Sequence, residues 1–207
     1  MKTIMGLFGI ATRKVIFTIL GIYLLSISCT KELSAVAPPT TGSVSIFTTQ
    51  VPMGPTYNDS TGGIELGLKF QSSVAGYADG IKFYKTSGDA GTHTGQLYSS
   101  DGTLLASAVF TNETDSGWQR VLFATAIPIA ANTTYIAAYF SSLGNYTSTV
   151  FGLKTAILNP PLTALADSTD GINGVYKYTN TPALPDSGYL SNNYWVDIIA
   201  SVNNIQP

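Results

Sequence analysis

The single histidine of the chain, His93, is the residue whose ordinary chemistry best suits proton transfer near neutral pH. It lies between Gly91 and Gly95, and this spacing predicts a tight loop. The sequence has no Gly-X-Ser-X-Gly nucleophile motif, and its one cysteine is Cys29 near the amino terminus. Three interpretations of His93 therefore stay open: a histidine that hydrogen-bonds the backbone of its loop, a ligand contact, and a general acid or base.

Acidic side chains occur in two segments that read as loops. Glu113 and Asp115 could flank a sugar as in glycoside hydrolysis, or they could cap a turn, as acidic residues in loops often do. Asp167 and Asp170 are candidate oxygen ligands for a structural Ca²⁺ ion, with a plain Asp-rich turn as the alternative. One histidine and one cysteine exclude a zinc site built from those residue types, and no other cofactor is predicted.

Aromatic side chains are the most suggestive feature of the sequence, which has 12 tyrosines and two tryptophans. Sugars stack their C–H faces on aromatic rings while their hydroxyl groups need polar partners. Trp118 is two residues from Arg120, and Trp195 is two residues from Asp197, so each pair shares one face of a strand. We consider both pairs as candidate ligand contacts. The alternative is that each tryptophan packs into the core at an edge of the sandwich, because tryptophan is usually largely buried.

The first 28 residues have the pattern of an export signal. Lys2, Arg13 and Lys14 precede an apolar run over residues 15–28, which is shorter than the ~20 residues that a membrane-spanning helix needs. The run ends directly before Cys29, as in a bacterial lipoprotein signal, so Cys29 is the predicted lipidation site. An ordinary signal peptide followed by a chance cysteine is the alternative.

Residues 29–43 are predicted to be the lipidated cysteine and a flexible tether, because they contain two adjacent prolines and little apolar material. Residues 44–207 are predicted to form one domain. Its apolar residues recur with a period of two between Gly, Asn, Asp and Pro, which indicates an all-β, antiparallel β-sandwich of jelly-roll or immunoglobulin-like type. Residues 153–192 have fewer strand signals and are expected to form long loops across one end.

The alternation also predicts which side chains face the core. The expected inward sets are Ile64, Leu66, Leu68 and Phe70; Ile81 and Phe83; Leu104, Ala106, Ala108 and Phe110; Val121 and Phe123; Thr134, Ile136, Ala138 and Phe140; and Tyr194, Val196, Ile198, Ala200 and Val202. Tyr135 and Tyr139 are expected on the opposite face from Ile136.

Charge makes one class of partner unfavourable. Only 11% of the residues are charged and the formal net charge is −2, so the chain lacks the basic patch that nucleic-acid binding requires. The expected partners are the lipid bilayer, through Cys29, and a glycan.

Several motifs in a fixed order carry a family resemblance. They are Gly91–Tyr98 (GTHTGQLY), Gly102–Phe110 (GTLLASAVF), Asn112–Phe123 (NETDSGWQRVLF), Ala131–Tyr139 (ANTTYIAAY), Pro161–Leu165 (PLTAL), Asn173–Tyr176 (NGVY) and Asn193–Asp197 (NYWVD). Together they resemble the bacterial family of unknown function numbered 4082, from about Val44 to Val202. The resemblance implies an accessory or binding role in secreted proteins. Tyr98 stands where the family pattern has Trp, and we retain it as a candidate ligand contact.

These observations favour a non-catalytic surface module, lipid-anchored in a bacterial outer membrane, that binds carbohydrate or a cell-surface partner. A carbohydrate-active enzyme, either a glycoside hydrolase or a lyase, is the first alternative. It would need a cleft that holds two carboxylates. A structural or adhesive subunit is the second, and it would expose an unpaired edge strand or an apolar patch.

The lipid anchor gives a direct prediction. Cys29→Ala should abolish lipid labelling and move the protein out of the detergent phase, because no other segment of the mature chain is apolar enough to hold a membrane. Labelling with palmitate and detergent phase partitioning measure this. A Cys29→Ala protein that still takes up palmitate and stays with the membrane would show that the lipoprotein prediction is wrong.

Overall fold

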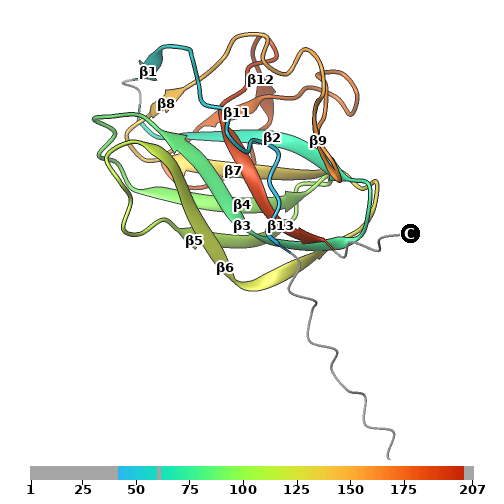
Figure 1. The fold of residues 1–207 in the computed structure, drawn as a ribbon. Coiled ribbons are helices and arrows are strands. Elements are labelled where there is room, and N and C mark those ends of the chain that lie inside the picture. Colours follow the sequence, from blue (N-terminus) through green and yellow to red (C-terminus); the bar gives the residue numbers. More distant parts are fainter. Residues whose placement is uncertain (1–41, 60–61, 203–207) are drawn as a thin grey trace, which may run out of the picture. The chain divides into compact units, whose positions relative to one another are not determined.

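The computed structural model describes residues 42–59 and 62–202, and within these ranges the chain is built from strands, turns and loops (Figure 1). The strands are β1 (Thr56–Asn58), β2 (Ile64–Ser72), β3 (Gly76–Lys85), β4 (His93–Ser99), β5 (Leu104–Val109), β6 (Gly117–Ile129), β7 (Tyr135–Ser141), β8 (Asn145–Thr147), β9 (Ile157–Asn159), β10 (Leu162–Ala164), β11 (Val175–Tyr178), β12 (Ser187–Gly188) and β13 (Val196–Val202). No helix in this part of the chain is long and apolar enough to cross a bilayer. The predicted signal peptide, Cys29 and most of the tether lie outside the described residues.

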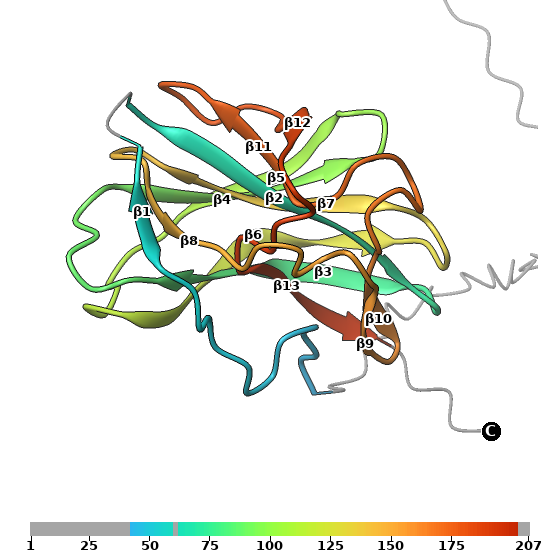
Figure 2. The same ribbon diagram turned by 90° about the horizontal axis from the view of Figure 1, so that it is seen from above.

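Two antiparallel sheets of unequal width pack face to face and confirm the predicted β-sandwich (Figure 2). The larger sheet has the order β12-β11-β2-β7-β4-β5, and β9 and β10 extend it beside β2. The smaller sheet has the order β13-β3-β6. Strands β1 and β8 form a separate two-stranded ribbon. A sheet of three strands therefore faces one of eight, and loops and the ribbon must cover the rest of the larger sheet.

The core between the sheets follows the alternation in most strands. In β2 the side chains of Ile64, Leu66, Leu68 and Phe70 are all buried in it, as predicted. Val196, Ile198 and Ala200 of β13 are also in this core, together with Tyr194 just before the strand. Burial of these apolar side chains supplies the main favourable term in folding.

Strand β7 reverses the predicted phase. Tyr135, Ala137 and Tyr139 pack in the core between the sheets, whereas Ile136 and Ala138 belong to a second apolar cluster on the outer face of the larger sheet. Every residue of β7 is buried. Because both faces of this strand are covered, the pattern of polar and apolar residues does not distinguish inside from outside.

Two further expectations change in the structure. Leu104, predicted inward, is 52% exposed, because the pairing of β4 with β5 shifts register at Tyr98 and this bulge reverses the phase at the start of β5. Residues 153–192, predicted as loops, contain β9 to β12, and β11 joins the larger sheet beside β2. These strands have only 2–4 residues each, too few for a visible period.

A buried ion pair fastens the segment before β1 to the outer face of the smaller sheet. Asp197 is fully buried, and its carboxylate accepts the backbone N–H groups of Ile46 and Phe47 at 3.0 and 2.8 Å. Lys82 Nζ lies 3.2 Å from Asp197 Oδ2 and donates to the carbonyl of Phe47. Burial raises the pKa of Asp197 to about 6, although Lys82 and the backbone donors lower it.

Aromatic rings complete this attachment. Phe47 contacts both tryptophans, with ring centroids 6.0 Å from Trp118 and 5.2 Å from Trp195. Trp195 is 8% exposed, and its backbone has a φ of 54°, a strained value for a bulky residue. The backbone N–H of Trp195 donates to Asn193 Oδ1 at 2.9 Å. Trp195 therefore contributes to packing as a core residue would.

A buried acid lies on the other outer face, that of the larger sheet. Glu65 of β2 is fully buried beside Tyr98, beneath the segment that contains Ala183 and Leu184. The backbone N–H of Ala183 donates to its Oε2 at 3.3 Å, and the Gln96 amide, oriented to satisfy its neighbours, donates to its Oε1 at 2.6 Å. Desolvation still dominates and raises the pKa of Glu65 to about 9.

Glu65 should make stability fall as pH rises. Between pH 4.5 and about 9 the unfolded chain loses the Glu65 proton while the folded chain keeps it, so folding takes up a proton. Relative to the native protein, Glu65→Gln should gain stability across this window, by at most ~1.4 kcal/mol per pH unit. Urea unfolding of both proteins at several pH values measures the difference. A difference that stays constant with pH would contradict the assignment.

Trp195→Ala should destabilise the protein by about 3–5 kcal/mol, because it removes a buried ring from a packed cluster. Trp118→Ala should cost less, because Trp118 is only half-buried. Thermal and urea unfolding compare the two variants. An unchanged melting temperature in Trp195→Ala would mean that this ring does not stabilise the fold.

Candidate functional site

Six tyrosines surround a pocket of about 280 Å³, which we call the tyrosine pocket. They are Tyr57, Tyr146, Tyr176, Tyr178, Tyr189 and Tyr194. Asp59, Asn192 and Ser148 supply polar groups, and Ile64 and Val150 complete the lining. The volume lies near the lower end of the range for small-molecule sites, and aromatic walls with a few polar groups are typical of them.

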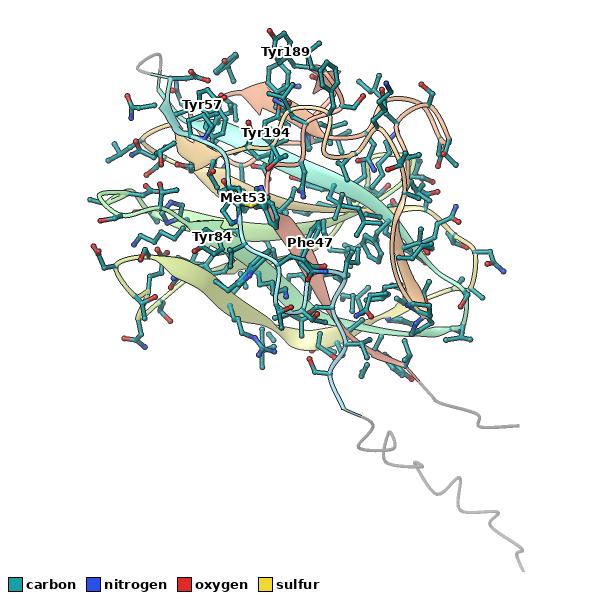
Figure 3. The ribbon with its side chains drawn as sticks, turned by 45° about the horizontal axis from the view of Figure 1, so that its top comes forward. Phe47, Met53, Tyr57, Tyr84, Tyr189 and Tyr194 are labelled. Carbon is teal, nitrogen blue, oxygen red and sulfur yellow. The ribbon has the colours of Figure 1, made fainter. Side chains whose placement is uncertain are left out.

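The unequal sheets explain where this pocket forms. Tyr176 and Tyr178 of β11 pair with Leu66 and Ile64 of β2, so their side chains lie on the inner face of the larger sheet. The smaller sheet has no strand to cover that region, and the β1–β8 ribbon and the segment before β13 supply Tyr57, Tyr146 and Tyr194 instead. Figure 3 shows Tyr57, Tyr189 and Tyr194 gathered toward one end of the sandwich.

The rings contact one another in a continuous series. Tyr57 stacks on Tyr146 with centroids 5.3 Å apart, and Tyr146 meets the edge of Tyr194 at 5.9 Å. Tyr176 makes edge contacts with Tyr194 at 6.4 Å and with Tyr178 at 5.6 Å. These contacts order five of the six rings, those other than Tyr189, against one another.

Asp59 orients two of these tyrosines. The hydroxyls of Tyr146 and Tyr178 donate to Asp59 Oδ2 at 2.9 and 2.8 Å. The hydrogen bond to Asp59, followed by partial desolvation and the charge of Asp59, raises the pKa of Tyr178 to about 12. Burial is the first cause for Tyr146, whose pKa is also raised. Both phenols therefore keep their protons at neutral pH.

Asn192 brings an unsatisfied polar atom to the pocket. Its side chain is 5% exposed, and its Oδ1 has no hydrogen-bond partner in the described part of the chain. Buried polar atoms are nearly always paired, since leaving one unpaired costs ~1–3 kcal/mol. This oxygen is closed to solvent, so it is a local cost in the fold and not a contact offered to a ligand.

The sequence-predicted residues Trp118, Arg120, Trp195 and Asp197 lie outside the tyrosine pocket, on the outer face of the smaller sheet. The structure brings the two tryptophans together, with ring centroids 6.3 Å apart, although they lie far apart in the sequence. Arg120 is exposed and lines a shallow hollow with Trp118. Asp197 is fully buried under the segment that contains Phe47.

A wider apolar groove of about 520 Å³ runs beside this cluster. Phe47, Val51, Met53 and Trp195 line it, and Met53 is 97% exposed. The Nε1–H of Trp195 donates to Thr149 Oγ1 at 3.0 Å, and its ring is tilted by 44° against the ring of Phe47. This groove has fewer hydrogen-bonding groups than the tyrosine pocket and therefore less capacity to orient a polar ligand.

His93 lies at the start of β4, not in an exposed loop, and is fully buried. Its Nδ1 is 3.0 Å from both carboxylate oxygens of Glu113, and its Nε2 is 2.9 Å from Asp89 Oδ2. Lys85 Nζ pairs with Glu113 at 2.9 Å. Because a carboxylate engages each ring nitrogen, neither nitrogen is placed to activate a nucleophile. The network instead ties β3, β4 and the loop before β6 together.

The other predicted ligands are also separated from the tyrosine pocket. Tyr98 is 4% exposed within the outer cluster of the larger sheet, and burial raises its pKa. Asp167 accepts hydrogen bonds from the Asn173 N–H and the Ser191 hydroxyl, which lower its pKa. Lys69 Nζ donates a hydrogen bond to the backbone carbonyl of Asp170 at 2.6 Å. Residues 42–59 and 62–202 hold no group of three or more His, Cys, Asp or Glu side chains suited to a metal ion.

Sequence reasoning missed the tyrosine pocket as a site. The high tyrosine content was visible, and Tyr176 and Tyr178 alternate as residues on one face of a strand should. Nothing in the sequence placed them near Tyr57, more than a hundred positions earlier. The two strands that bring Tyr57 to the pocket, β1 and β8, are only three residues long, too short to show a pattern.

The comparisons with known proteins identify a family. No curated protein matches this chain. A family model described as a domain of unknown function, DUF4082, matches residues 49–196, which include both the tyrosine pocket and the buried His93 network. That match covers most of the chain and agrees with the motifs seen in the sequence. The chain therefore belongs to the DUF4082 family.

Proposed function

We propose that this protein is a non-catalytic, lipid-anchored surface module that binds carbohydrate in the tyrosine pocket. The observation that carries the proposal is the grouping of six tyrosine rings around Asp59 and Asn192. Aromatic faces can stack on the apolar face of a sugar ring, and the carboxylate, amide and phenol groups can bind its hydroxyls. A pocket of about 280 Å³ suits one sugar ring better than a long chain.

The acids of the molecule support binding without catalysis. Glycoside hydrolysis commonly uses two carboxyl groups on either side of the scissile bond. Asp59 is the one carboxylate among the described residues that line the tyrosine pocket. Glu65 is enclosed beneath its loop, and Glu113 is held by Lys85 and His93, so neither faces this pocket.

The proposed location follows from the sequence. Lipidation of Cys29 would hold the domain at a bacterial outer membrane, with residues 30–43 as a tether. A short tether and a pocket near one end of the sandwich are compatible with capture of glycans at the cell surface.

Tyr189→Ala should weaken glycan binding at least tenfold, or ~1.4 kcal/mol, while leaving stability almost unchanged. Tyr189 lines the pocket but is 58% exposed, so its removal leaves no core cavity. A glycan array with the detergent-solubilised full chain identifies binders, and calorimetric titration of the best binder measures the loss.

Tyr77→Ala is the matched control, because Tyr77 is also exposed, at 38%, but lies on β3 and outside the pocket lining. It should bind as the native protein does. Equal losses in the two variants would contradict the assignment of the pocket, and a native chain that binds no glycan on the array would contradict the proposed function.

A further inference from the structure

The tyrosine pocket carries an unbalanced negative charge. Asp59 is the only charged residue among the described residues that line it, and no lysine, arginine or histidine is among them. The ion pairs within residues 42–59 and 62–202 involve other acids, namely Asp89, Glu113, Asp186 and Asp197. A positively charged ligand would therefore gain electrostatic free energy that a neutral one would not.

The polar atoms around Asp59 accept hydrogen bonds. Tyr146 and Tyr178 donate their hydroxyl protons to Asp59, so a ligand meets the lone pairs of their oxygens. Both oxygens lie beside the Asp59 carboxylate, which accepts as well. A ligand group with several N–H donors matches this set of acceptors better than a hydroxyl, which has a single proton.

The tyrosine rings also favour a positively charged ligand. The face of a tyrosine ring attracts a cation within ~6 Å of its centroid. Four of these rings, those of Tyr57, Tyr146, Tyr176 and Tyr194, line the same pocket as Asp59. Figure 3 shows Tyr57 and Tyr194 on this side of the molecule, with Tyr189 at its rim.

We propose that the tyrosine pocket selects sugars that carry a protonated amino group, with Asp59 pairing the ammonium and the phenol oxygens of Tyr146 and Tyr178 accepting its N–H bonds. This inference rests on the proposed carbohydrate binding and names its ligand class. The tyrosine faces would enclose both the cation and the apolar face of the sugar ring.

The test uses three trisaccharides with the same β-1,4 linkage: the glucosamine trimer, its N-acetylated form and the glucose trimer. Calorimetric titration of the detergent-solubilised full chain at low salt should give at least tenfold tighter binding of the glucosamine trimer than of either neutral trimer. Asp59→Asn should remove this preference, since it removes the charge and keeps an acceptor. Asp101→Asn is the control, because it makes the same change in an exposed turn and should keep the preference.

Salt provides a measurement that needs no variant. Raising the ionic strength from roughly 50 to 500 mM should reduce the preference of the native chain for the glucosamine trimer, because salt screens a partly exposed ion pair. A preference that does not change with salt would overturn the pairing with Asp59, even where Asp59→Asn disturbs folding.

The remaining outcomes separate the two proposals. Equal affinity for all three trimers, or binding of neutral glycans alone, would overturn the amine preference and leave carbohydrate binding intact. Choline binding as tightly as the glucosamine trimer would show that the pocket recognises the cation without the sugar, and the proposed carbohydrate function would fail. A glucosamine trimer that does not bind would overturn the amine preference directly.

Discussion

Two sheets of unequal width cannot cover each other with strands alone, and the rest of this structure depends on that mismatch. The smaller sheet has three strands, and the larger has six along its main path. The inner face near β2 and β11 is therefore covered by the β1–β8 ribbon and by the segment before β13. Short connecting segments leave space where a full sheet would interdigitate, and the tyrosine pocket lies in that space.

Part of the outer face of each sheet is covered as well, and each covered part carries buried polar groups. On the smaller sheet, Asp197 and Lys82 hold the segment that contains Phe47. On the larger sheet, Glu65 lies beneath the segment that contains Ala183. Burying an acid is costly, as the raised pKa values of Asp197 and Glu65 show, but hydrogen bonds from the covering backbone partly offset this cost and fix where each segment lies.

The tyrosine pocket differs from these buried networks in its charge balance. Asp197 and Glu113 each have a lysine partner, whereas Asp59 is held by two phenol hydroxyls. A phenol donates a hydrogen bond without neutralising the carboxylate, so the pocket keeps its negative charge while its rings stay ordered. The same two hydrogen bonds therefore position the aromatic walls and leave the charge for a ligand.

The sequence by itself determined the all-β class, the phase of β2 and of β13, and the common face of Trp118 and Arg120. Each of these depends on a period of two, which is a local property of the chain. The sequence could not show which residues of β7 face the core, because both faces of this strand are buried. It could not show the bulge near Leu104 either, because that bulge depends on how β5 pairs with β4. Only the tertiary structure decided that Phe47 packs against both tryptophans and that Tyr57, Asp59, Tyr178 and Asn192 share one pocket. These contacts join segments far apart in the chain, and the pairing of strands and the need to cover two unequal sheets bring them together.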